Sequence, residues 1–163
     1  MAKNAFSTHL KVVVGESVIA SSAATLSVMA FEVPVWAMFV GWISFFTRGL
    51  NLKQGVVNLA CVLIGVVLGV GAAHAVAALT PILGSYAISA VVFLITILAL
   101  SLARVPVFNN LLGLFLGLVA YFAWHQPPSI ATFGMLALAA TLGATAAFLA
   151  HSLQQRIRQS AAH

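Results

Sequence analysis

The lysine and arginine residues of this chain lie in only four short segments, and long apolar runs separate these segments. The seven cations are Lys3, Lys11, Arg48, Lys53, Arg104, Arg156 and Arg158. The remaining gaps between apolar runs carry only Glu32 or no charge. Because positively charged loops stay on the cytoplasmic side of a membrane, this alternation predicts six spans with both termini in the cytoplasm.

The composition indicates that the solvent of this chain is lipid. Of its 163 residues, 63% are hydrophobic and only 6% are charged, whereas a soluble domain is about 25% charged. We therefore expect an all-α polytopic membrane protein with a single membrane domain, residues 1–163, and the lipid bilayer as its partner. The net charge of +5 does not indicate nucleic acid, since the scattered cations form no basic stripe. Contact with anionic headgroups suits them better.

The apolar runs predict spans at residues 12–31, 34–47, 54–79, 82–103, 106–123 and 129–152. All five prolines fall at the gaps, where a fixed φ and a missing N–H suit a helix start. The second run is short, because 14 helical residues rise about 21 Å against a hydrocarbon core of about 30 Å. A re-entrant segment is the alternative. The charges favour a crossing, since otherwise Arg48 and Lys53 would share a side with Glu32.

A repeated pattern divides the chain into two halves, about 1–80 and 81–163. Residues 39–47 and 115–123 both read Phe, any residue, Gly, two apolar residues, a small residue, two aromatic residues and a small residue. A Pro-Val pair precedes each stretch, and Leu68-Gly69 is echoed by Leu142-Gly143. Three spans per half is an odd number, so the second half enters the membrane inverted. Inverted three-helix repeats are an architecture of transporters, with the site near the midplane where the halves meet.

The aromatic-glycine stretch also carries a family resemblance. Followed by Arg48-Gly49 and Lys53-Gln54-Gly55, and echoed after Val105-Pro106, it resembles the small bacterial inner-membrane proteins of the YcdZ type, a family named only as a domain of unknown function. The resemblance covers nearly the whole chain and rests on Gly and Phe. It implies a multi-pass protein of the bacterial cytoplasmic (inner) membrane. It implies no substrate and no catalytic residue.

Polar and aromatic side chains inside the spans are candidates for a solute pathway. Ser17, Ser21 and Thr25 recur every four residues and share one helical face, a spacing that is also typical of close helix packing. Glu16, the only acid inside an apolar run, faces either a bundle interior or the headgroups. The predicted pathway residues are Glu16, Ser17, Ser21, Thr25, Phe39, Gly41, Phe45, Asn109, Asn110, Phe115, Gly117 and Tyr121.

Small-residue motifs predict where helices touch. Gly65 and Gly69, like Gly113 and Gly117, are spaced for close contact between helices or subunits, so we expect a homo-oligomer. Asn109 and Asn110 suit hydrogen bonds to a solute, to a neighbouring helix or to a helix start. Mid-span rings such as Phe45 and Tyr121 either narrow a pore or face lipid.

We expect no enzyme, metal or cofactor, because the sequence lacks metal-ligand spacing and a nucleophile–base pair. The favoured function is a channel or facilitator for a small neutral or weakly polar solute. An ion-coupled carrier needs ionisable groups at depth, and the interior offers only Glu16 near one face and His74 near the other. The alternative is a non-transporting membrane scaffold or subunit that packs through its glycine faces. A proton- or ion-coupled carrier would depend on Glu16.

Overall fold

The computed structural model describes residues 2–161, with side chains from residue 6 onward, and the described part is all-helical. Its six helices are α1 (Ala2–Met29), α2 (Val35–Phe46), α3 (Leu52–Leu83), α4 (Tyr86–Leu102), α5 (Leu111–Trp124) and α6 (Ile130–Ser160). The all-α fold class predicted from the sequence is confirmed over these residues.

Three of the helices are long and apolar enough to cross a membrane. They are the Phe6–Met29 part of α1, with 24 residues, α3 with 32 and α6 with 31. At 1.5 Å per residue, α3 and α6 rise about 45–48 Å, more than a hydrocarbon core of about 30 Å. The other three helices, α2, α4 and α5, are apolar but shorter, with 12, 17 and 14 residues. The chain is therefore a membrane-like helical protein with three clear candidate spans.

Several helix boundaries differ from the prediction. Pro81 lies inside α3, so the break expected there is wrong; a proline in the last turn removes only one helical hydrogen bond. Helix α5 begins at Leu111 after Asn110, and Pro106 lies in the preceding connection. Helices α1 and α6 extend well past the predicted runs, to Ala2 and Ser160, because their outer turns are polar but still contain good helix formers.

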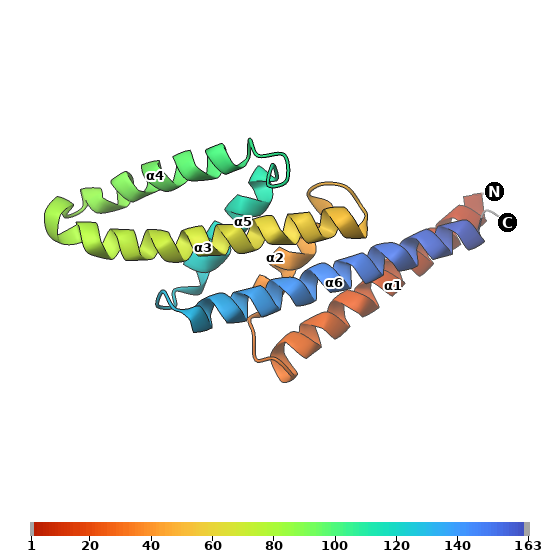
Figure 1. Cartoon of the computed structure of the whole chain (residues 1–163). Helices are drawn as coiled ribbons and strands as arrows, with labels where there is room; N and C mark the ends of the chain where they lie inside the picture. The colour runs from red at the N-terminus through yellow and green to blue at the C-terminus, as the bar shows by residue number, and fades with distance from the viewer. Residues whose placement is uncertain (1, 162–163) are drawn as a thin grey trace.

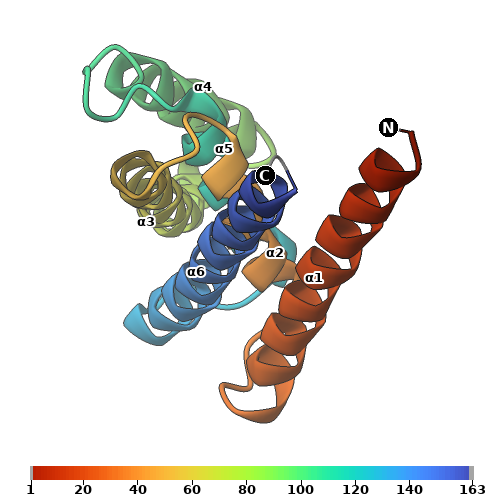
Figure 2. The ribbon, with the colours of Figure 1, turned by 90° about the vertical axis from the view of Figure 1, so that its right-hand side faces the viewer.

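The helices are arranged around two crossings (Figures 1 and 2). Helix α2 packs against α6, and α5 packs against α3 in the same way. Helices α3 and α6 touch each other and run in opposite directions in Figure 1. Helix α1 then lies against α6, and α4 lies against α3. Four central helices are thus flanked by one outer helix on each side.

The connections gather at two edges of the molecule. In Figure 1, the α1–α2, α3–α4 and α5–α6 connections lie along the lower left edge. The α2–α3 and α4–α5 connections lie along the upper right edge, toward which both ends of the chain also point. The segments that carry the seven cations are those of the upper right edge. The fold therefore separates positive charge from the opposite edge.

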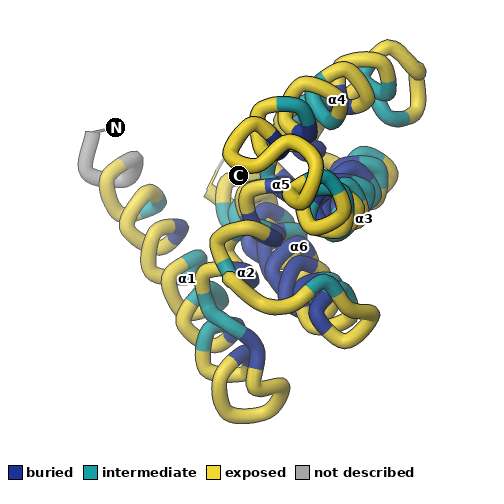
Figure 3. Tube along the Cα trace, turned by 90° about the vertical axis from the view of Figure 1, so that its left-hand side faces the viewer, coloured by how far each residue is buried: buried dark blue, intermediate teal, exposed yellow. Residues whose placement is uncertain are grey.

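The packed core lies where the four central helices meet, as the dark blue segments of Figure 3 show. Its main apolar cluster consists of Val33, Ala37, Val66, Ala120, Tyr121, Leu136 and Ala139. Helices α1 and α4 are exposed over most of their surface (Figure 3). Small side chains dominate this core, so the helix backbones approach one another closely.

Candidate functional site: two glycine crossings and an asparagine network

Helix α2 meets α6 at a crossing where the two backbones touch. A Cβ atom added to Gly41 would overlap the carbonyl group of Ala140 on α6. In the reverse direction, a Cβ added to Gly143 would overlap the carbonyl oxygen of Met38 on α2. We call this contact the α2–α6 crossing. It has no room for even a methyl group at either glycine.

Helix α5 meets α3 in the same geometry, which we call the α5–α3 crossing. A Cβ added to Gly117 would overlap the carbonyl oxygen of Val62, and one added to Gly65 would overlap that of Leu114. In both crossings the carbonyl that is struck belongs to the residue three positions before the partner glycine. The two contacts are therefore built to one plan, with Gly41 and Gly117 in matching places.

The burial of the four central helices follows the same plan. The buried positions of α2 are 37, 38, 41, 44 and 45; adding 76 gives 113, 114, 117, 120 and 121, and all five are buried in α5. The buried positions of α3 are 55, 58, 61, 62, 65, 66, 69 and 72. Adding 78 gives eight positions of α6, and seven of them, all except 133, are buried. Each pair of helices therefore buries the same face.

A network of polar side chains joins three helices near the upper right edge. The amide of Asn110 donates to Thr47 Oγ1 at 2.7 Å and to Asn58 Oδ1 at 2.8 Å. The amide of Asn58 in turn donates to the backbone carbonyl oxygen of Arg48 at 2.8 Å. Asn110 also caps α5, because its side-chain oxygen accepts the Gly113 N–H at 3.0 Å. Both asparagines are buried, so the network holds α2, α3 and α5 together.

The predicted pathway residues of α1 lie apart from these contacts. Ser17, Ser21 and Thr25 are all exposed, and each hydroxyl donates to a backbone carbonyl of its own helix at 2.8–3.0 Å. Glu16 is half-buried beside Gly15, where a Cβ would meet the Leu153 side chain of α6. The structure therefore keeps the α1 hydroxyls on the outer surface, away from Gly41 and Gly117.

The predicted aromatic residues also divide between core and surface. Phe45 is fully buried, and its ring packs against those of Phe46, Phe148 and His151. Tyr121 is buried against Gly69. Phe39 and Phe115 are exposed at the molecular surface. The rings do not converge on one passage.

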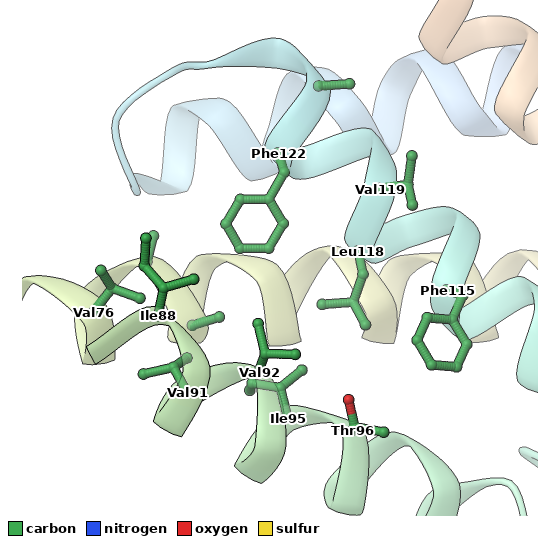
Figure 4. Close-up of a pocket in the computed structure, with 13 residues that line it drawn as sticks. Val76, Ile88, Val91, Val92, Ile95, Thr96, Phe115, Leu118, Val119 and Phe122 are labelled. Carbon is green, nitrogen blue, oxygen red and sulfur yellow. The ribbon is translucent and has the colours of Figure 1, made fainter. Parts of the chain in front are cut away.

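Phe115 lines an apolar groove between α3, α4 and α5. Figure 4 shows its ring and that of Phe122 on α5 opposite the side chains of α4, with Thr96 the one polar side chain that is labelled. The groove has a volume of about 770 Å³. It lies on the flank of the molecule and is open to its surroundings, so it suits an apolar occupant such as a lipid chain.

Sequence reasoning placed Asn110 just inside a span and gave Thr47 no role. In the structure, Asn110 is the residue before α5, and Asn109 is exposed in the preceding connection. Gly113, predicted at a helix contact, faces Cys61 and Asn110. The sequence signal that could have indicated a role for Thr47 is its position at the end of the first aromatic-glycine stretch. There it is the residue after α2, and its hydroxyl accepts a hydrogen bond from the Asn110 amide.

These features define a membrane-like helical protein whose centre is made of close helix crossings. The chain belongs to the family described as "Protein of unknown function (DUF1097)", which matches residues 13–151. No curated protein and no solved structure matches the chain significantly.

Proposed function

We propose that the chain crosses the membrane six times as two inverted repeats of three helices. The support is the shared plan of the two crossings and the matching burial of α2 with α5 and of α3 with α6. The opposite directions of α3 and α6 also suit an inverted pair (Figure 1). The three shorter helices would cross obliquely or in a locally thinned bilayer.

The proposed location is the bacterial cytoplasmic membrane, with both termini inside, as the YcdZ-like resemblance and the placement of the cations suggest. Cysteine labelling tests this in a Cys61→Ser background. A membrane-impermeant maleimide should label Gln126→Cys from outside the cell and Gln159→Cys only after the membrane is opened. Labelling of both positions from the same side would contradict the six-span arrangement.

For its activity, we propose that the protein is a non-enzymatic membrane subunit that packs against other membrane helices, in the simplest case copies of itself. The observation that carries this proposal is the outer face of α1, where Ser17, Ser21 and Thr25 are exposed at four-residue spacing. Their hydroxyls are already bonded to their own helix. They therefore need no solute, and their small size lets another helix approach.

The centre of the chain is less suited to conduction. A pathway between the halves would pass Gly41 and Gly117, where backbone meets backbone and a methyl group does not fit. A neutral solute would have to separate these helices to pass.

Cross-linking in native membranes tests the subunit proposal. In the Cys61→Ser background, Ser21→Cys on α1 should form a disulfide-linked dimer on mild oxidation. Phe93→Cys, which is 66% exposed on α4 and does not line the groove, is the matched control and should remain monomeric. Dimers from Phe93→Cys alone, or from neither variant, would contradict an interface on α1.

A channel or facilitator for a small neutral solute is the second candidate. What favours it is the hydroxyl-bearing surface itself, because Thr141 and Thr145 of α6 are also exposed. A hydroxyl oxygen that donates to its own helix can still accept a hydrogen bond from a solute. Several copies could enclose a pathway between such faces. Proteoliposomes with glycerol or urea as the probe test this. If these proteoliposomes swell no faster than empty liposomes, the channel is ruled out for these solutes and the subunit proposal stands. If they swell faster and Ser21→Leu abolishes the difference, the channel replaces the subunit proposal.

A further inference from the structure

A hollow with two cationic side chains lies between α1 and α6 at the upper right edge of the molecule. Its volume is about 310 Å³. Thr8 and Lys11 line it from α1, and Arg156, Ile157, Ser160 and Ala161 line it from the end of α6. One turn further along α1, the Leu153 side chain of α6 packs against Gly15. The hollow is thus a defined space between two helices.

The lining suits an anionic group that carries oxygen atoms. A guanidinium and an ammonium from separate helices surround one space, and both donate charge-assisted hydrogen bonds to phosphate oxygens. Thr8 and Ser160 add hydroxyl groups. The chain has only two acids, and neither Glu16 nor Glu32 lines the hollow. None of the described residues that line the hollow balances this positive charge.

The surroundings favour a phospholipid over a free phosphate ion. Val14 and Val18 follow Lys11 by three and seven residues, so all three lie on one side of α1. Both valines are more than half exposed, at 54% and 57%. An acyl chain can lie along this apolar strip while its phosphate occupies the hollow. Ile157 and Ala161 supply apolar contact for the glycerol part.

We infer that Lys11 and Arg156 form a binding site for the phosphate of an anionic phospholipid, at the end of the α1–α6 pair. Basic hollows between helices at the cytoplasmic face are suited to such headgroups. The phosphate-binding pair includes none of the residues assigned to the proposed α1 interface or to a solute pathway. It uses residues that neither crossing contains.

The test is native mass spectrometry of the full chain in a mild non-ionic detergent, with phosphatidylglycerol or phosphatidylcholine added. We expect one phosphatidylglycerol to be retained in preference to phosphatidylcholine. The Lys11→Gln/Arg156→Gln variant should bind phosphatidylglycerol roughly 25-fold more weakly, since two cationic contacts are lost at about fivefold each. Lys53→Gln/Arg158→Gln is the matched control, because it removes the same charge outside the hollow, and it should change binding less than about twofold.

Three outcomes would overturn the inference. Equal loss of phosphatidylglycerol in the two double variants would mean that net charge alone attracts the lipid. Equal retention of phosphatidylcholine would mean that the site does not distinguish an anionic headgroup from a zwitterionic one. Stoichiometric binding of inorganic phosphate that depends on Lys11 and Arg156, without preference for phosphatidylglycerol, would assign the hollow to a free anion. Both variants must show the unaltered thermal midpoint, as expected for exposed residues.

Discussion

The two crossings at the centre of the molecule are alike, whereas the two outer helices beside them differ. At the α2–α6 and α5–α3 crossings, glycine meets a carbonyl three residues before the opposite glycine. On the outside, α1 exposes small hydroxyl residues at 17, 21 and 25 among its apolar side chains, whereas α4 exposes mainly large apolar ones, among them Phe93 and Leu94 at 66% and 53%. The two halves therefore bury matching positions in their central helices but expose different side chains on their outer helices.

This difference teaches what each surface has to satisfy. Lipid tails make no directional contact, so a lipid-facing helix gains from large apolar side chains such as those of α4. A helix that receives another helix needs small side chains so that the backbones can approach. The outer face of α4 therefore serves as an internal reference for a lipid-facing helix, and the hydroxyl-bearing positions of α1 depart from it.

The largest effect is expected from substitutions at the two crossings, and it tests whether the crossings are equivalent. Gly41→Ala and Gly117→Ala each place a methyl group where a backbone carbonyl lies, so the helices must separate. Overpacking against a side chain costs about 1–3 kcal/mol, and a backbone yields less easily. We expect each variant to lose about 3 kcal/mol or more of unfolding free energy, measured by steric trapping in bicelles.

The control variants are Gly71→Ala on α3 and Gly134→Ala on α6, where an added Cβ meets nothing within 4 Å. These should be neutral or slightly stabilising, because alanine favours a helix over glycine by about 0.5–1 kcal/mol. If Gly41→Ala lost much more stability than Gly117→Ala, the two crossings would not be mechanically equivalent. Equal stability of all four variants would contradict the close contacts themselves.

A smaller effect concerns a feature that only one half has. Asn110 precedes α5 and forms the polar network, whereas Pro34, at the matching place before α2, has no side-chain cap. Asn110→Ala leaves the buried Asn58 amide oxygen and the Thr47 hydroxyl without this partner. An unsatisfied buried polar group costs about 1–3 kcal/mol. We expect the thermal midpoint in detergent to fall accordingly.

Asn109→Ala is the neighbouring control, because Asn109 is exposed. It should leave the midpoint unchanged. A comparable fall in both variants would point to the connection before α5 rather than to the network. A further check is Thr47→Val, which removes one bond of Asn110 and the local bond to the Ser44 carbonyl oxygen. It should lower the midpoint less than Asn110→Ala, because the bonds of Asn110 to Asn58 and Gly113 remain.

The sequence was sufficient to predict an all-helical chain. The buried positions of α2 and α5 differ by 76, which is also the offset between the two Phe-x-Gly stretches. Local hydrophobicity indicates where the helices lie in the sequence. A glycine with aromatic neighbours is distinctive enough to align the two stretches with each other. The prolines were a poorer guide. Pro34 aligns with Asn110 as the residue before a helix, not with Pro106.

The register of α3 against α6 was not predictable from composition. The sequence pattern paired Gly69 with Gly143, whereas the contacts place Gly65 in the position that matches Gly143. Both helices are rich in Gly, Ala and Val, so several alignments of the two helices have similar sequence identity. Only the identity of the buried face distinguishes them, and that depends on which helix packs against which. Likewise, the spacing of Ser17 and Ser21 showed that they share one face of α1, but not whether this face points toward the core or toward the outside.

The smallest effect is expected from the residues that cap α3 and α6, and it tests the correspondence between these two helices. Asn51 and Ser129 precede α3 and α6 and differ by the same 78 positions; each side chain accepts the N–H of the residue three positions later. Loss of such a cap costs about 0.5–2 kcal/mol. Asn51→Ala and Ser129→Ala should therefore lower the unfolding free energy by similar amounts, each less than Gly41→Ala. Ser129 also bonds Thr132 Oγ1 at 3.0 Å, so its loss should be the larger by a few tenths of a kcal/mol. A marked effect from Asn51→Ala alone would show that only one of the two helices depends on its start, and the offset of 78 would then describe geometry without equal energetics.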